Sequence, residues 1–255
     1  MAVNYLIDGP HDGQPVVLSG SLGSDLRMWE PQAAALAAAG YRVLRCDHRG
    51  HGKSPVPRGP YSMAHLGADV LTLLDRLDIA QAHFVGLSLG GMVCMWLAQH
   101  TPQRLSTLTL CCTSAELGPP SSWSDRAHLV RTQGTQSVSS TVVQRWFTPQ
   151  WRAANPARTR YYERMVSGTP AEGYASCCTA IQTMDIAAGL SSITAPTLVI
   201  AGAQDPATPP PHGQRIASSI PLARFETISP AAHLASAELP DTVNDLILGH
   251  LKHNS

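Results

Sequence analysis

The chain has 255 residues, with 18 basic and 18 acidic side chains and therefore no formal net charge at pH 7. This length suits a single α/β domain that carries an inserted segment. No run of Lys or Arg provides a basic face, so neither nucleic acid nor an anionic membrane is an expected partner. No stretch is apolar for long enough to span a bilayer, and residues 1–8 lack the features of a signal peptide.

The cysteines indicate a reduced compartment. Six are present, four of them in adjacent pairs: Cys46, Cys94, Cys111, Cys112, Cys177 and Cys178. Adjacent cysteines are poor disulfide partners, and most of the six lie in apolar patterns, so we expect small buried thiols in the cytoplasm. The absence of a C-x-x-C pair argues against structural zinc, and the sequence calls for neither a metal nor a cofactor.

In chain order, the first half alternates short apolar runs with helical patterns. Strands are expected at residues 14–19, 41–46, 82–85 and 105–112, and helices at 28–39, 61–78 and from about 92 to 100. The helix at 61–78 has apolar residues at helical spacing, among them Leu66, Val70 and Leu74. Such alternation predicts an α/β fold with a mostly parallel central sheet flanked by helices.

The alternation stops at Gly118 and resumes with a strand at 196–202, a helix at 211–219, a strand at 224–228 and a helix at 240–251. The interruption is polar and helix-prone, and it contains three of the five tryptophans, Trp123, Trp146 and Trp151. We expect residues 118–191 to form a helical cap, or lid, over a core made of residues 1–117 and 192–255. The alternative is an independent second domain, which so few aliphatic residues would stabilise poorly.

Residues 86–90 read G-L-S-L-G and stand between an apolar strand and a helix. A strand–turn–helix unit with G-x-S-x-G can hold its serine in a strained, exposed position, so Ser88 is the predicted nucleophile. A side chain at Gly86 or Gly90 would collide with neighbouring backbone in so tight a turn. A bare G-x-S-x-G also occurs by chance, but here both flanking elements are present.

A serine hydroxyl needs a base, and the base needs an acid that orients it. In this kind of fold the chain order is serine, acid, histidine, with each on a loop after a strand. Asp205 follows the strand at 197–201 and is the expected acid, and His233 follows the strand at 224–228 and is the expected base. The alternatives are Asp185 and Glu116 for the acid and His212 for the base.

An oxyanion needs two backbone N–H donors. Leu89 directly follows the nucleophile at the N-terminal end of a helix, so its N–H is one expected donor. The N–H of Leu22, in the loop after the strand at 14–19, is the other. Gly20 and Gly23 permit the shape of that loop.

Residues 50–54, G-H-G-K-S, look like the end of a phosphate-binding loop. That motif requires a glycine five residues before the glycine of Gly-Lys-Ser, and Asp47 occupies the position. We therefore expect a structural loop here and no nucleotide site.

These motifs resemble the α/β-hydrolase superfamily over nearly the whole chain, through D-x-R-G-x-G-x-S at 47–54 and the Ser88, Asp205, His233 order. Within it the chain is most similar to the 3-oxoadipate enol-lactonases, through residues 21–29, 86–92, 145–149, 173–178, 184–185 and 205–210. Two departures bear on fine specificity. Gly20 stands where related enzymes often carry Asn or His, and Ser176 where Gly is expected.

The resemblance implies hydrolysis of the five-membered enol-lactone of 3-oxoadipate, through an acyl-enzyme on Ser88, in bacterial breakdown of aromatic compounds by the β-ketoadipate pathway. The substrate is then a small anionic lactone, whose carboxylate needs a donor. Arg131, Arg27 and the Ser21 hydroxyl are the candidates, and Trp146 is the expected wall for the ring. For each arginine, a solvated surface charge is the competing interpretation.

Other functions remain open. A general carboxylesterase or a carbon–carbon bond hydrolase would use the same serine, histidine and aspartate. Haloalkane dehalogenases and epoxide hydrolases need Asp where Ser88 stands. A non-catalytic ligand-binding protein is an alternative from another class, because fold alone does not determine function.

Overall fold

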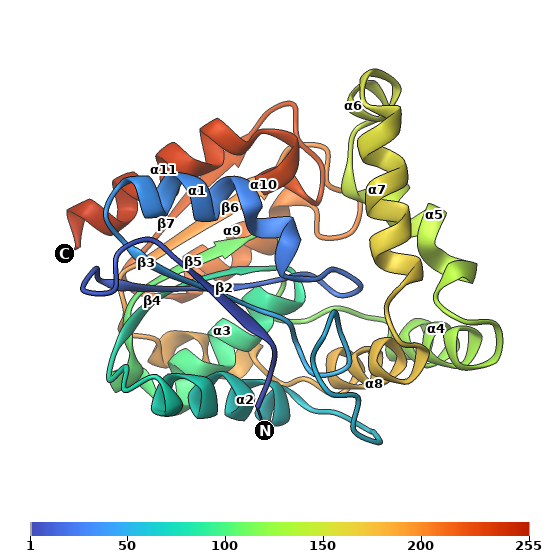
Figure 1. Ribbon diagram of the computed structural model, residues 1–255, viewed down its shortest axis with the longest axis horizontal. Coiled ribbons are helices and arrows are strands. Elements are labelled where there is room, and N and C mark those ends of the chain that lie inside the picture. The colour runs from blue at the N-terminus through green and yellow to red at the C-terminus, as the bar shows by residue number, and fades with distance from the viewer. Residues whose placement is uncertain (1, 255) are drawn as a thin grey trace.

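Seven strands form one central sheet in the computed structural model, which describes residues 2–254 (Figure 1). Their order is β1-β3-β2-β4-β5-β6-β7, and every neighbouring pair is parallel except β1 with β3. The strands are β1 (Tyr5–Asp8), β2 (Pro15–Ser19), β3 (Arg42–Cys46), β4 (Ala82–Leu87), β5 (Leu105–Cys111), β6 (Thr197–Gly202) and β7 (Ala223–Ile228). The expected α/β fold with a mostly parallel sheet is confirmed.

Helices cover both faces of this sheet (Figure 1), with α1 and α11 on one face and α2 and α3 on the other. The helices that follow the strands are α1 (Glu30–Ala38), α2 (Met63–Arg76), α3 (Leu89–His100), α9 (Pro210–Ser219), α10 (Ala235–Glu238) and α11 (Pro240–His253). Short 3₁₀ segments occupy Leu26–Trp29, Pro102–Arg104 and Ala187–Ser192. Because helices cover the sheet on both sides, both faces of the central strands are buried, and this explains why their sequences are continuous apolar runs.

Five further helices interrupt the alternation between β5 and β6 and lie together beyond one end of the sheet (Figure 1). We call them the insert: α4 (Pro120–Gln133), α5 (Gln136–Trp146), α6 (Pro149–Ala154), α7 (Pro156–Ser167) and α8 (Ala171–Gln182). Pro120, Pro149 and Pro156 stand at the first positions of three of these helices. Proline suits that position, because its fixed φ is helical and no intrahelical bond needs its N–H.

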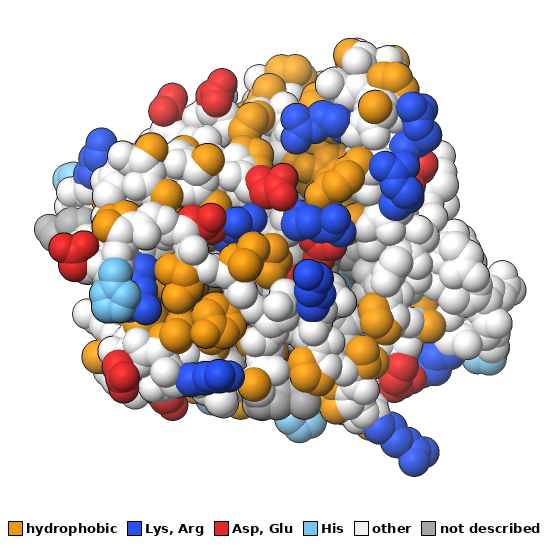
Figure 2. Space-filling view, viewed as in Figure 1, with side chains coloured by type: hydrophobic (Ala, Val, Ile, Leu, Met, Phe, Trp, Pro, Cys, Tyr) orange, Lys and Arg blue, Asp and Glu red, His pale blue; other side chains and the backbone are white. Residues whose placement is uncertain are grey.

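Strand β1 was not among the expected elements. It is four residues long, and its two central side chains, Leu6 and Ile7, are 48% and 39% exposed. Figure 2 shows hydrophobic side chains at the surface on this side of the sheet. A short edge strand that is half exposed lacks the apolar run by which the buried strands are recognised in the sequence.

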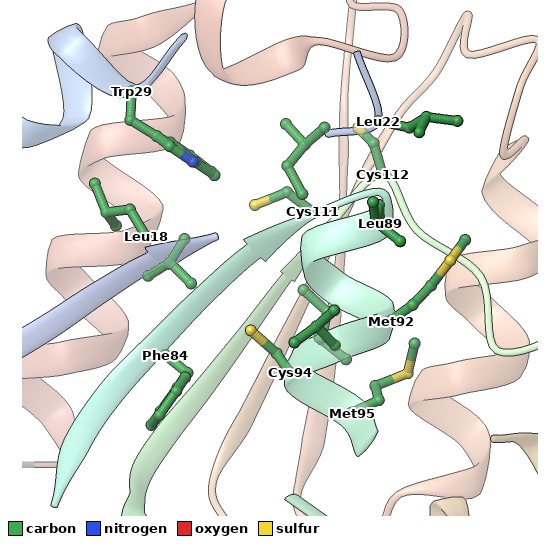
Figure 3. Close-up of a cluster of buried hydrophobic side chains, with 14 of the residues drawn as sticks. Leu18, Leu22, Trp29, Phe84, Leu89, Met92, Cys94, Met95, Cys111 and Cys112 are labelled. Carbon is green, nitrogen blue, oxygen red and sulfur yellow. The ribbon is translucent and has the colours of Figure 1, made fainter. Parts of the chain in front are cut away.

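The core lies between the sheet and the helices (Figure 3). Leu18 of β2 and Phe84 of β4 are fully buried there. Cys94 of α3 points toward the strands, whereas Met92 points away from them, toward the insert. Helix α3 therefore packs on the sheet with one side and faces the insert with another.

Candidate active site

Ser88 stands in a strained turn between β4 and α3. Its backbone has φ 56° and ψ −116°, a conformation that residues with a side chain rarely adopt. Its N–H donates to the carbonyl of Cys111 at 3.0 Å, and its carbonyl accepts from the Thr113 hydroxyl at 2.7 Å. These bonds hold the serine backbone at the end of the sheet.

Two glycines allow this turn to pack against the strands. A Cβ at Gly90 would lie 2.0 Å from the Ser19 carbonyl oxygen, and one at Gly86 would lie 2.4 Å from the Gly90 carbonyl oxygen. Both distances are far below van der Waals contact, so the expected collision is confirmed. Figure 3 shows the result, with Leu89 entering α3 directly after the turn.

Asp205 and His233 are brought together at the same edge of the sheet. Asp205 follows β6 and His233 follows β7, so both lie at the carboxyl ends of parallel strands, as Ser88 does after β4. The Nδ1 atom of His233 is 2.8 Å from Oδ2 of Asp205, and both side chains are buried. When Nδ1–H donates to the carboxylate, Nε2 is the ring nitrogen left to accept a proton.

The carboxylate of Asp205 is held by further donors. Its Oδ1 accepts from the N–H groups of Ala207 and Thr208 at 2.7 and 3.0 Å, and its Oδ2 accepts from the Thr208 hydroxyl at 2.8 Å. Burial raises the pKa of Asp205, but the charge of His233 and these hydrogen bonds outweigh burial and leave the pKa below 3.8. Asp205 is thus an ionised acceptor at neutral pH.

The alternative acids and base lie elsewhere. Glu116 forms an exposed salt bridge with Arg215 at 3.2 Å, and Asp185 is exposed. His212 bonds to the hydroxyl of Ser114 at 2.8 Å. Only Asp205 among the three acids considered contacts His233.

The loop after β2 is held in place by two buried histidines. Nε2 of His48 is 3.0 Å from the Gly20 carbonyl oxygen, and Nε2 of His51 accepts from the Gly23 N–H at 3.0 Å. Gly23 has φ +80°, a conformation that favours glycine. Among residues 2–254 the N–H of Leu22 makes no hydrogen bond, so it is free to donate.

Both histidines are neutral. Burial lowers the pKa of His48 below 6.5, and burial together with the nearby His48 lowers the pKa of His51 to about 3. A neutral His51 keeps a lone pair on Nε2 for Gly23, which a protonated ring would lose. The loop that carries Leu22 therefore rests on an acceptor that stays available at neutral pH.

The G-H-G-K-S run at residues 50–54 also helps to hold the loop after β2, because it contains His51. Asp47 is buried, and its carboxylate accepts from the N–H groups of Leu26 and Lys53 at 2.7 and 2.9 Å and from the Asn4 amide at 2.7 Å. These bonds close the loop on itself, as expected for a structural segment.

A cavity of about 360 Å³ opens between this edge of the sheet and the insert. Five of the residues expected in the site line it: Ser21, Leu22, Ser88, Trp146 and His233. Other lining residues come from the insert and from α3, including Met92, Trp123, Arg126, Val142, Arg145, Tyr174 and Ile181. The volume suits a small molecule.

The expected position of the cation needs correction. Arg131 does not line the cavity: it forms a salt bridge with Glu172 at 3.0 Å and lies 3.4 Å from the hydroxyl of Ser176. Arg27 forms a salt bridge with Asp25 at 2.6 Å and also lies outside the cavity. Two other arginines of the insert do line it.

Arg126 of α4 and Arg145 of α5 are these two arginines, and they were not singled out in the sequence. Arg131 follows Arg126 by five residues, which rotates its side chain by about 140° around the helix. One signal for Arg126 was available in the sequence. It follows Trp123 by three residues, so the two lie on the same face of the helix, and both line the cavity. Within residues 2–254 neither Arg126 nor Arg145 forms a salt bridge, so no carboxylate competes with a ligand for either charge, and the hydrogen-bond partner of Arg126 is the neutral Tyr174 side chain.

The part of the chain that the structure describes contains no group of three His, Cys, Asp or Glu side chains placed to hold a metal ion. Nor does any helix in residues 2–254 have the length and apolar character needed to cross a membrane.

Comparison with known proteins places this chain in a family. The chain matches the model of the alpha/beta hydrolase fold over residues 14–240. It is 39% identical over 252 residues to 3-oxoadipate enol-lactonase 2 of Acinetobacter baylyi, an alignment that covers 99% of this chain and 94% of that protein.

Solved structures agree. The crystal structure of the enol-lactonase from Burkholderia xenovorans LB400 superposes with a TM-score of 0.96 at 39% identity, covering 98% of this chain and 96% of that one. A thermophilic esterase from Thermogutta terrifontis superposes with a TM-score of 0.94 at 27% identity, covering 99% and 94% of the two chains. The chain therefore belongs to the α/β-hydrolase family and is a carboxylic ester hydrolase of the 3-oxoadipate enol-lactonase group.

Proposed function

We propose that the protein opens the enol-lactone ring of 3-oxoadipate through an acyl-enzyme on Ser88. The observation that carries this proposal is the cavity itself. It combines Ser88 and His233 with two arginines that have no carboxylate partner in residues 2–254 and with the indole of Trp146. A small lactone that bears a carboxylate matches this combination, and the similarity to enol-lactonases supports the same substrate.

In the proposed first step the Ser88 hydroxyl attacks the lactone carbonyl carbon while Nε2 of His233 takes its proton. The N–H groups of Leu22 and Leu89 donate to the oxyanion, and the start of α3 adds its dipole. The ring C–O bond then breaks. The oxygen leaves as an enol that takes the proton held on Nε2 of His233 and then tautomerises to the ketone, while the acyl group stays on Ser88.

In the second step water attacks the acyl-enzyme. His233 accepts a proton from the water, the oxyanion forms again between the same two N–H groups, and Ser88 leaves with the proton from His233. The product is 3-oxoadipate. An enolate is a better leaving group than an alkoxide, so the ring opening needs less help from an acid.

We further propose that Arg126 and Arg145 receive the carboxylate of the substrate. A guanidinium donates two parallel hydrogen bonds to a carboxylate, which fixes both position and orientation. Arg126 is held by Trp123, with the guanidinium carbon 5.1 Å from the ring centroid. This contact supports the guanidinium without using up its donors.

Residues 118–191, which include the insert, would then act as a cap that closes the cavity over the substrate and supplies its anion-binding groups. All six cysteines are buried free thiols, which favours a reducing, cytoplasmic setting for the reaction in aromatic catabolism.

The test compares two substrates. Purified protein is assayed for loss of the ultraviolet absorbance of the enol-lactone and for release of p-nitrophenol from p-nitrophenyl acetate. We expect a kcat/KM for the enol-lactone at least about a hundredfold above that for the neutral ester, since the two arginine contacts act only on the anion. Equal values, or a preference for the neutral ester, would instead favour the general carboxylesterase.

A further inference from the structure

A buried carboxylate outside the catalytic set connects the insert to the loop that carries His233. Glu238 ends the short helix α10, and its side chain is buried. One carboxylate oxygen, Oε1, accepts from the N–H of Thr148 at 3.0 Å and from the Thr148 hydroxyl. The other, Oε2, accepts from the N–H of Ala232 at 2.8 Å.

The donors belong to two segments that are far apart in sequence. Thr148 lies in the insert, between α5 and α6, and Ala232 directly precedes His233. Within residues 2–254 Glu238 forms no salt bridge, so these three hydrogen bonds are what hold its carboxylate. Hydrogen bonds to a charged acceptor are among the stronger ones.

A second bond runs parallel to the first on the other side of His233. The N–H of Leu234 donates to the carbonyl of Trp146 at 2.8 Å. The residues before and after His233 are therefore both tied to the segment 146–148. That segment includes Trp146, whose side chain lines the cavity.

We propose that Glu238 is a positioning residue that holds His233 and the cavity wall at Trp146 in one fixed relative position. This inference rests on the proposed role of His233 as the base. A base on a loop must stay within about 0.5 Å of its productive position, and the histidine loop has no strand or long helix of its own to hold it there. The Glu238 carboxylate provides that constraint, because it bonds the segment before His233 to the segment that carries Trp146.

Glu238→Gln tests the proposal because an amide has one acceptor oxygen and one donor nitrogen. Whichever way it turns, its NH₂ group faces the backbone N–H of either Ala232 or Thr148, and that backbone hydrogen bond is lost even where the Thr148 hydroxyl turns to accept from the amide. We expect kcat for the enol-lactone to fall at least about tenfold. The rate constant for labelling of Ser88 by a fluorophosphonate should fall in the same proportion, while the fraction of enzyme finally labelled stays near one.

That last readout separates positioning from mere stability. A structural role would lower the fraction of labelled enzyme and leave the rate constant of the folded fraction unchanged. The matched control is Glu172→Gln, which alters a carboxylate that also bonds a distant backbone N–H, that of Gly59 at 3.2 Å, but lies outside the cavity. Its kcat and labelling rate should stay within about twofold of wild type.

A pair at position 148 decides the matter even if Glu238→Gln fails to fold. Thr148→Ser keeps the hydroxyl, which donates to Glu238 and accepts from the Trp151 N–H, and should behave as wild type. Thr148→Val removes it and should lower both kcat and the labelling rate about threefold or more, while the fraction of enzyme finally labelled stays near one. Equal kcat values for the two, or a folded Glu238→Gln enzyme with unchanged kcat and labelling rate, would overturn the proposal.

Failure of the proposed function gives a different pattern. If the enol-lactone is not the substrate, the labelling rates still report on Glu238, because labelling does not require that lactone. If His233 is not the base, His233→Ala will be labelled as fast as wild type, regardless of what Glu238→Gln does.

Discussion

The proposed recognition of an anionic substrate depends on two residues, Arg126 and Arg145. Both line the cavity, and neither forms a salt bridge within residues 2–254. Arg131 lies on the same helix as Arg126 but is bound to Glu172. Helix α4 therefore offers both a residue to substitute, Arg126, and a matched control, Arg131.

For Arg126→Met we expect KM for the enol-lactone to rise at least about tenfold, since a hydrogen bond to a charged group contributes about 1.5–3 kcal/mol. Methionine keeps much of the apolar stem, so the cavity wall is retained. The matched variant Arg131→Met should leave KM unchanged. Steady-state assays of both decide: a rise for Arg131→Met, or none for Arg126→Met, would move the anion site away from Arg126.

At the residue scale the sequence predicts the candidate catalytic residues better than the residues that would bind the substrate carboxylate. Strand-end positions and chain order single out Ser88, Asp205 and His233, because parallel strands bring their carboxyl ends to one edge. The structure places Asp205 and His233 in hydrogen-bond contact there. Which arginine faces the cavity depends instead on how α4 is rotated in the insert, and no motif encodes that rotation.

At the scale of elements, the contact between β2 and α3 sets the relative position of the two expected oxyanion donors. The N–H of Gly90 donates to the carbonyl of Gly20 at 2.9 Å, so the start of α3 is bonded to the loop that carries Leu22. Both expected oxyanion donors therefore depend on one close approach of a helix to a strand. A glycine at position 90 is what permits it, since a Cβ would lie 2.0 Å from the Ser19 carbonyl oxygen.

Gly90→Ala should therefore push α3 away from β2 and separate the two donors. We expect kcat to fall about a hundredfold or more, the usual effect of losing an oxyanion donor, together with a lower melting temperature. Gly249→Ala is the matched control, because a Cβ at that position of α11 meets no atom within 4 Å. It should leave kcat unchanged and raise stability slightly. Full activity in Gly90→Ala would contradict this role of the contact.

The elements themselves were predicted to different degrees. The buried strands and the long amphipathic helix α2 follow from their apolar patterns. Strand β1 does not, because half of its side chains are exposed and its pairing with β3 is made by long-range backbone hydrogen bonds. The hydrogen bond from the Thr148 N–H to Glu238 likewise joins residues 90 positions apart, which no local pattern reveals.

At the scale of the whole molecule, several buried histidines link folding to pH. Burial is the main cause that lowers the pKa of His48, His51, His83 and His250, to about 3 for His51 and about 4 for His83. In the unfolded chain these groups titrate near 6.5. As pH falls below that value the unfolded state binds protons that the folded state does not, so the free energy of unfolding decreases.

We expect the contribution of these histidines to the free energy of unfolding to be constant above pH 7. From pH 6.5 to 4 the free energy of unfolding should decline by up to about 1.4 kcal/mol per pH unit for each histidine. Urea unfolding at half-unit intervals of pH measures the slope. His83→Gln, a change far from the cavity, should make the slope shallower by the share of one histidine. A midpoint that does not change with pH would show that these rings take up protons over the same pH range in the folded and the unfolded protein.

The central claim is that Ser88 opens an enol-lactone ring. The most direct measurement follows the loss of the enol-lactone absorbance with wild type and with Ser88→Ala, purified in parallel and shown by circular dichroism to be folded. We expect turnover by wild type, labelling of its Ser88 by a fluorophosphonate, and a kcat at least about 10⁴-fold lower in Ser88→Ala. Turnover that survives in folded Ser88→Ala would contradict it.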